Sequence, residues 1–179
     1  MNPSLSKALA KGIPAAIAAG VLLASPTLWA QEKAAKANAN QRIVGVWRLV
    51  SDSNTGADGV KKAGAGFGDN PKGIFIFMRD GRYASINTRN DLPKFASASR
   101  LQGTAEENKA IVQGSIAHFG TYSLTPDGKL LTLKPEASTW PAWIGVEQKR
   151  NLTIQGDQMK YTLAASFGGT SELIYKRAK

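Results

Sequence analysis

The sequence lacks cysteine altogether and has a single histidine, His118, among its 179 residues. Without cysteine the chain has no disulfide, no thiolate metal ligand, no cysteine nucleophile and no residue for lipoprotein-type acylation. One histidine cannot form a multi-histidine metal site, and we expect neither a metal nor another cofactor. The place of His118 at the start of a predicted strand predicts a surface or capping role.

The chain also lacks an apolar run long enough to span a membrane. Residues 13–24 form the longest run, which is shorter than the ~20 residues that a spanning helix needs. Lys7 and Lys11 precede this run, and Pro26 and a possible cleavage site after Ala30 follow it. This order is typical of a secretory signal peptide. We therefore predict a signal peptide over residues 1–30 and export to the periplasm or the medium of a bacterium, with a membrane anchor as the alternative.

Acidic residues are scarce as well, with 13 Asp and Glu against 23 Lys and Arg, a net charge of +10. The basic residues are scattered along the chain, which is typical of a solvated surface. The excess of positive charge favours anionic partners, such as a carboxylate ligand or, peripherally, an acidic membrane surface. Export and the lack of a concentrated basic and aromatic surface argue against a nucleic-acid partner.

What the sequence does contain is a succession of short strands. Residues 31–40 are polar without an apolar period and predict a flexible leader, so the domain should span residues 41–179. Asp80-Gly81 separates two strand-like runs, and because Asp-Gly suits the positive φ of a two-residue turn, it indicates an antiparallel hairpin. The predicted strands cover residues 42–51, 73–79, 82–88, 118–125, 129–135, 145–154, 158–166 and 170–177.

These strands predict an all-β fold, an eight-stranded antiparallel up-and-down β-barrel. Closure leaves no exposed strand edge, and eight strands enclose room for one small ligand. The capping box Thr104-Ala105-Glu106-Glu107 predicts one short helix between the third and fourth strands. The glycine-rich residues 56–73 predict a mobile loop at the barrel mouth, since no helix follows to make a phosphate-binding loop.

Several motifs together resemble the bacterial lipocalin-like domain family, over residues 41–179. Gly45-Val46-Trp47 is similar to the lipocalin signature at the start of the first strand. The resemblance implies that Trp47 closes one end of the barrel and that Arg177 lies over its ring, a cation–π pairing. A helix within the series of strands departs from true lipocalins, whose helix follows the barrel. The further motifs are Asp80-Gly81-Arg82, Arg89, Phe119-Gly120-Thr121-Tyr122, Trp140-Pro141-Ala142-Trp143-Ile144-Gly145, Gln148 and Arg150.

The most chemically dense stretch runs from Glu136 to Arg150. Strand alternation places Gln148 and Arg150 on the same face as Leu152, which predicts that both point into the barrel. A buried arginine is costly without a partner, and Glu136, near the end of the preceding strand, is the expected one. The two side chains form either a structural ion pair or a site in which Arg150 anchors an anion and Glu136 orients it.

Further side chains are candidates for ligand contact. Two tryptophans in the loop before Arg150 should cover the pocket, and polar groups in an otherwise apolar cavity are typical of those that orient a ligand. An ordinary core position is the alternative explanation for each of these residues. The candidates are Trp140, Trp143, Tyr83, Asn87, Tyr122 and Tyr161.

Two hypotheses of function follow. The first is a binding protein whose barrel holds a small, mostly apolar and anionic molecule near Arg150. The second is an isomerase or cyclase on the same barrel, in which Glu136 or a tyrosine moves a proton while Arg150 stabilises negative charge. A catalytic carboxylate would face the cavity with a raised pKa, whereas a structural one would be engaged by Arg150.

Overall fold

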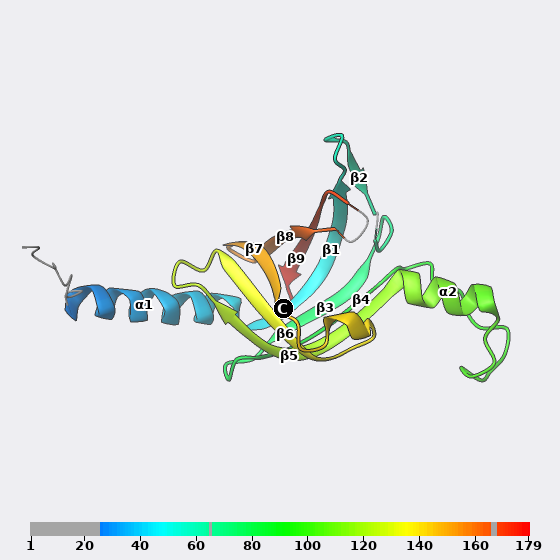
Figure 1. Ribbon diagram of the computed structural model, residues 1–179, viewed down its shortest axis with the longest axis horizontal. Coiled ribbons are helices and arrows are strands. Elements are labelled where there is room, and N and C mark those ends of the chain that lie inside the picture. The colour runs from blue at the N-terminus through cyan, green and yellow to red at the C-terminus, as the bar shows by residue number, and fades with distance from the viewer. Residues whose placement is uncertain (1–25, 65, 166–167) are drawn as a thin grey trace, which may run out of the picture.

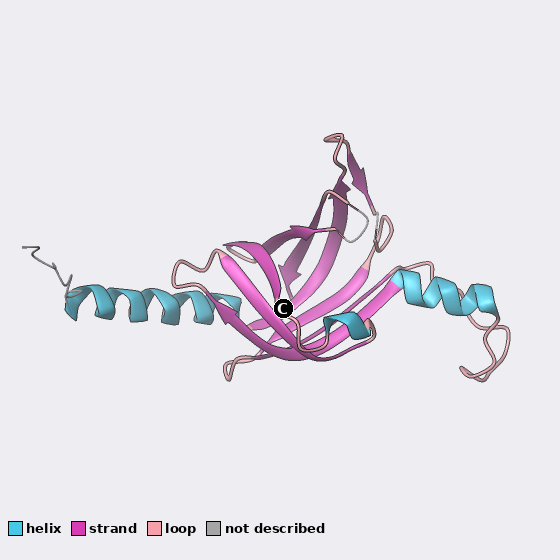
Figure 2. Ribbon diagram, in the orientation of Figure 1, coloured by secondary structure: helices cyan, strands magenta, loops and turns pink. Residues whose placement is uncertain are grey.

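The computed structural model describes residues 26–64, 66–165 and 168–179, so most of the predicted signal peptide lies outside the described residues. Strands dominate the described chain (Figure 2). The elements are α1 (Pro26–Ile43), β1 (Gly45–Thr55), β2 (Lys61–Ala63), β3 (Lys72–Phe77), β4 (Arg82–Thr88), α2 (Ala105–Gly114), β5 (Ser115–Leu124), β6 (Leu130–Ser138), the short 3₁₀ helix η1 (Pro141–Trp143), β7 (Gln148–Gln155), β8 (Gln158–Ala164) and β9 (Thr170–Arg177).

The strands form one antiparallel sheet that closes on itself. Its order is β2-β1-β3-β4-β5-β6-β7-β8-β9, and an additional pairing of β1 with β9 closes the ring. Only β2 stands outside this ring, as a three-residue strand paired with the end of β1 from Ser53 to Thr55. The eight remaining strands confirm the predicted up-and-down barrel, with α2 between its third and fourth strands.

Alternation along each strand sorts side chains to the interior or the surface. In β4 the residues Tyr83, Ser85 and Asn87 are buried while their neighbours are not. In β1 a register shift between Leu49 and Ser51 changes the alternation. As a result, Asp52 is buried beyond the bulge, following Trp47 and Leu49 before it.

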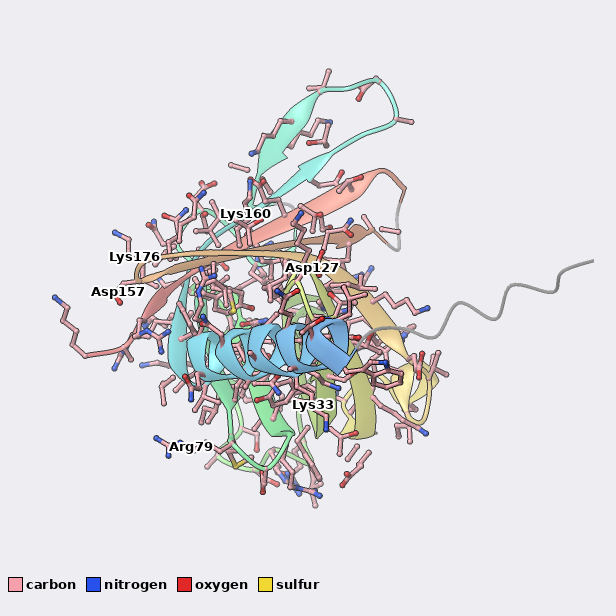
Figure 3. All side chains as sticks on the ribbon, turned by 90° about the vertical axis from the view of Figure 1, so that its left-hand side faces the viewer. Lys33, Arg79, Asp127, Asp157, Lys160 and Lys176 are labelled. Atoms are coloured by element: carbon pink, nitrogen blue, oxygen red, sulfur yellow. The ribbon has the colours of Figure 1, made fainter. Side chains whose placement is uncertain are left out.

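The two ends of the barrel differ. At one end lie the tight hairpin turns and the C-terminal part of α1, and we call this the closed end. Figure 3 views the molecule from the side of α1, and its labels Arg79, Asp127 and Asp157 mark the β3–β4, β5–β6 and β7–β8 turns at this end. At the other, open end lie α2, η1 and the longer loops, so α1 and α2 extend from opposite ends of the barrel (Figure 1).

The core fills the barrel with aromatic rings. Phe75 is fully buried and stacks on Phe77, with ring centroids 4.3 Å apart. It also meets the rings of Tyr83, Tyr161 and Tyr175 at 5.6, 6.4 and 5.9 Å. Phe75 therefore lies at the centre of the interior and joins the closed end to the open half.

Helix α2 begins as the sequence predicts. The Thr104 side chain accepts a hydrogen bond from the Glu107 amide at 3.2 Å, and Glu107 accepts one from the Thr104 amide at 2.8 Å. This capping box satisfies two amides that would otherwise lack partners at the helix start.

Residues 31–40, predicted as a flexible leader, have helical backbone within α1. Apart from Asn38 and Asn40, the segment consists of Ala, Lys, Glu and Gln, which have high intrinsic helix propensity whether or not they form an apolar face. The absence of an apolar period was therefore no evidence against a helix. The last turn of α1 is held by the barrel, since Ala39 packs against the core.

Candidate functional site

The closed end is a fully engaged structural cluster. Trp47 is completely buried, and its Nε1 donates to the Ile43 carbonyl at 2.7 Å. The Arg177 guanidinium lies 4.1 Å above the Trp47 ring and donates to the carbonyls of Val44 and Arg42 at 2.9 and 2.7 Å. The arginine thus satisfies carbonyls at the end of α1 while covering the tryptophan.

Arg150, in the open half, has very different surroundings. Only 3% of the residue is exposed, yet its Nε has no hydrogen-bond partner among the described residues. No described carboxylate lies within ion-pairing distance of it. Its guanidinium carbon lies 5.6 Å from the Trp143 ring and 5.4 Å from the Tyr161 ring. Arg150 is therefore a buried cation held between two aromatic rings and without an anionic partner in the described chain.

Glu136 does not pair with Arg150, which corrects the expectation from the sequence. Its carboxylate accepts a hydrogen bond from Arg82 at 2.8 Å, and both side chains are 46% exposed. The reason is the alternation of β6, where Leu131, Leu133 and Pro135 are buried and Glu136 is exposed. Sequence proximity to Arg150 in a hairpin did not put the two side chains on the same face.

A second polar pair lies beside Arg150. The Tyr83 hydroxyl and Nδ1 of His118 are 2.9 Å apart, and both residues are buried. His118 is 6% exposed, so the surface or capping role predicted for it is wrong. Ser85 faces His118 across the β4–β5 pairing, and its buried hydroxyl has no partner within the described chain.

A third group of polar side chains lies deeper in the barrel. Asn87 Nδ2 donates to the Tyr175 hydroxyl at 2.9 Å, and the hydroxyls of Tyr161 and Tyr175 are 3.2 Å apart. The rings of these two tyrosines stack with centroids 5.6 Å apart. Because Arg150 lies over Tyr161, this hydrogen-bonded chain supports one wall of the site around Arg150.

The remaining candidates lie in different places. Trp143 on η1 contacts both Arg150 and His118, whereas Trp140 is 53% exposed. Gln148 is partly buried, and its side chain donates to the Val146 carbonyl at 3.4 Å. Tyr122 lies toward the closed end, where its hydroxyl donates to the Met78 carbonyl at 2.9 Å. Of the predicted ligand contacts, Tyr161 and Trp143 meet Arg150 directly, and Tyr122 stands apart.

A loop is anchored at the open end by Asp52. Oδ2 of this buried carboxylate accepts the amides of Gly66 and Phe67 at 2.8 and 3.1 Å. The Phe67 side chain packs against the core. Part of the glycine-rich segment, predicted as a mobile loop, is thus held against the barrel, and residues 61–63 of it form β2.

Burial holds three residues around Arg150 in their neutral forms, namely His118, Tyr83 and Tyr175. Burial, and then the positive charge of Arg150, lower the pKa of His118 to about 3. Burial is also the main cause that raises the pKa of Tyr83 and of Tyr175 above the ordinary value of a tyrosine. At neutral pH the site therefore holds one cation among neutral hydrogen-bonding groups, an arrangement that attracts an anion.

Strand alternation in the sequence indicates some of the site residues that were missed. His118 shares its face of β5 with Gly120 and Leu124, both buried, so strand alternation alone would have placed it inside. Tyr175 follows Leu173 by two positions on β9 in the same way. Ser85 gives the same signal, because it alternates with Tyr83 and Asn87 on β4, whereas the register shift in β1 hides the inward position of Asp52.

A closed antiparallel barrel of eight strands, with a tryptophan at the start of the first strand covered by an arginine from the last, defines a lipocalin-type barrel. The chain belongs to the family of lipocalin-like domains, whose sequence model matches residues 44–177. No curated protein matches it.

Solved structures with a similar fold are distant in sequence. A lipocalin-like protein from Bacteroides uniformis is 14% identical, with 76% of this chain and 99% of that chain covered and a TM-score of 0.42. A redesigned beta barrel is also 14% identical over 79% and 96% of the two chains, with a TM-score of 0.42. A mutant of the fluorescent protein UnaG is 16% identical over 77% and 97%, with a TM-score of 0.37.

A groove on the outer surface lies apart from the interior site. A groove of about 640 Å³ runs between α1 and the β5–β6 turn, and its lining includes Ala39, Arg42 and Asp127 but none of the polar groups around Arg150. Among the described helices, none combines the length and apolarity needed to cross a bilayer.

Proposed function

We propose that this protein binds a small, mostly apolar anion inside its barrel, with Arg150 as the anchor. The observation that carries the proposal is the state of Arg150, which is buried and has no hydrogen-bond or ion-pair partner in the described chain. An unpaired buried charge costs several kcal/mol, on the order of the penalty for removing an ion from water. A ligand carboxylate or similar group would offset that cost.

The walls of the site support an apolar body for the ligand. Arg150 is framed by the rings of Trp143 and Tyr161, and the ring of Phe75 meets that of Tyr161 edge-on at 6.4 Å. Such a lining, with few polar groups, favours a largely apolar molecule with one charged end. Trp143 contacts both Arg150 and His118 from the open end, so we expect its ring to cover the bound ligand.

The alternative function, an isomerase or cyclase, relied on Glu136 as the main candidate base, and Glu136 does not face the interior. Glu136 lies on the outside of the barrel in an ion pair with Arg82. The pKa values of Tyr83 and Tyr175 are raised, and the lowered pKa of His118 makes it a weak base. Proton transfer at neutral pH works best with a group whose pKa lies near that pH, so these groups favour binding over catalysis.

The proposal includes export. The basic start and short apolar run of residues 1–30 support a cleaved signal peptide, and the expected cleavage site after Ala30 falls within α1. Mass spectrometry of the protein from its own host should find a chain that begins at Gln31. A chain that retains Met1 would contradict export by cleavage. A peripheral contact with an acidic membrane surface stays a prediction from the net charge.

Native mass spectrometry tests the binding function. The wild-type protein, purified from its own host, should carry about one apolar anionic molecule per chain. The Arg150→Met variant, which keeps the apolar stem, should lose it. The control is Arg48→Met, which removes an exposed arginine from the outer face of β1 and should keep the ligand. Retention of the same molecule by Arg150→Met would contradict the proposal.

A further inference from the structure

His118 and Arg150 both contact Trp143 at the open end, although they come from β5 and β7. Both side chains contact Trp143, with the His118 ring centroid at 5.5 Å and the Arg150 guanidinium carbon at 5.6 Å from the tryptophan ring. The positive charge of Arg150 also lowers the pKa of His118, which is consistent with their proximity. The His118 imidazole and the Arg150 guanidinium therefore belong to one site, which Trp143 joins.

One ring nitrogen of His118 is engaged and the other is free within the described chain. Nδ1 lies 2.9 Å from the Tyr83 hydroxyl, whereas Nε2 makes no hydrogen bond to a described residue. A neutral imidazole carries its hydrogen on one of the two nitrogens, and the hydrogen bond at the other decides which. The chemistry that His118 offers the site therefore depends on Tyr83.

The Tyr83 hydroxyl should be the donor in this pair. It is buried, and Nδ1 of His118 is its hydrogen-bond partner in the described chain. If Nδ1 carried the hydrogen, it would donate to the tyrosine oxygen, and the hydroxyl hydrogen would be buried without an acceptor. A buried donor without an acceptor is costly, so the arrangement with Tyr83 donating and the hydrogen on Nε2 is preferred.

We propose that Tyr83 holds His118 in the tautomer with hydrogen on Nε2, and that this N–H and the Arg150 guanidinium together bind an oxyanion head group. The inference rests on the proposed function and deepens it, because it assigns a second donor and a head group with at least two oxygens, such as a carboxylate or a sulfonate. The unpartnered hydroxyl of Ser85, across the strand pairing from His118, is available as a further donor. Tyr83 acts as a positioning residue, since it works through His118.

Nitrogen NMR of the imidazole tests the tautomer directly. Because His118 is the only histidine, a protein labelled with ¹⁵N at histidine gives one pair of ring signals without further assignment. At neutral pH the wild type should show a bare Nδ1 and a protonated Nε2. Saturation with 1-anilinonaphthalene-8-sulfonate, an apolar sulfonate, should shift the Nε2–H signal. Hydrogen on Nδ1, or an Nε2–H signal that stays in place at saturation, would overturn the inference.

Three variants separate this inference from the proposed function. His118→Phe keeps an aromatic ring but no donor, and should weaken binding of the sulfonate roughly tenfold or more, as for a lost hydrogen bond to a charged group. Tyr83→Phe keeps the imidazole but frees Nδ1, so it should abolish the tautomer preference and weaken binding less. Ser85→Ala removes only the further donor and should have the smallest effect.

The outcomes are distinguishable. If Arg150→Met loses binding while His118→Phe binds as tightly as the wild type, the anion site stands and the second donor does not exist. If Arg150→Met binds normally, the proposed function itself is wrong. Should His118→Phe fail to fold because the Tyr83 hydroxyl loses its partner, the double variant Tyr83→Phe/His118→Phe, which removes both polar groups, is measured in its place.

Discussion

Two arginines lie over tryptophan rings at opposite ends of the barrel. Arg177 covers Trp47 at 4.1 Å and donates hydrogen bonds to the carbonyls of Val44 and Arg42. Arg150 approaches Trp143 at 5.6 Å, and its Nε has no partner in the described chain. Arg177 is also partly exposed, whereas Arg150 is buried.

The comparison teaches that a cation–π contact does not by itself say what an arginine does. Where the guanidinium also satisfies backbone carbonyls, the contact is part of the fold, and removing it leaves buried acceptors unpaired. Where the guanidinium is buried with unpartnered nitrogen, the fold bears a cost that a ligand can relieve. The closed end therefore stabilises the fold, and the open half is where we propose that the ligand binds.

The largest effect is expected at the closed end from Trp47→Ala. Truncation of a fully buried tryptophan leaves a cavity and exposes the Ile43 carbonyl, and should lower the free energy of unfolding by about 3–5 kcal/mol. Urea denaturation measures this. The matched control Trp140→Ala removes a half-exposed tryptophan and should change stability by roughly 0.5 kcal/mol or less. An unchanged midpoint for Trp47→Ala would mean that Trp47 does not close the barrel.

The two arginines should respond in opposite directions to the same substitution. Arg177→Met leaves two carbonyls without their charged donor and should destabilise by about 2 kcal/mol. Arg150→Met removes an unpaired buried charge and should leave stability unchanged or raise it. Thermal and urea unfolding of the two variants in parallel provide the measurement. Equal destabilisation by both would remove the distinction between the two ends.

The free energy of unfolding should decrease with falling pH because His118 is buried in its neutral form. Its pKa is about 3 in the folded protein and about 6.5 in an unfolded chain, so the unfolded state binds the additional proton between these values. Stability due to this group is complete above about pH 6.5 and falls as the pH drops toward 3, by at most about 1.4 kcal/mol per pH unit. His118→Phe should flatten this slope between pH 6.5 and 4.5. Identical slopes for the two proteins would contradict the buried, neutral state.

The smallest effect is expected at α2, which extends away from the barrel (Figure 1). Thr104→Ala removes one half of the capping box and should cost about 1 kcal/mol of helix stability. Hydrogen exchange of the α2 amides should accelerate roughly fivefold, while exchange in the barrel strands stays the same. Equal acceleration in strand and helix would show that α2 is integral to the barrel.

Much of the barrel could be predicted from the sequence because its signals are local. Asp80-Gly81 required a tight turn, the alternation from Gln148 to Leu152 required Arg150 to face inward, and Thr104 with Glu107 required a helix start. Each of these follows from the geometry of a few neighbouring residues.

The site could be predicted only in part because it depends on contacts between distant strands. Glu136 was expected to pair with Arg150 because both lie in one hairpin. It lies on the outer face of β6, however, and forms an ion pair with Arg82 instead. The pairing of Tyr83 with His118 joins residues 35 positions apart, and no local pattern indicates it. A buried atom without a hydrogen-bond partner, such as Nε of Arg150, can be recognised only from the positions of all its neighbours in the structure.

The most direct test compares the binding of two probes that differ only in charge. 1-Anilinonaphthalene-8-sulfonate carries a sulfonate, and N-phenyl-1-naphthylamine is the same molecule without it. The folded wild type should prefer the sulfonate, and Arg150→Met should lose that preference while it still binds the neutral probe. The control Arg48→Met should behave as the wild type. If Arg150→Met keeps the full preference for the sulfonate, the barrel interior does not hold an anion at Arg150.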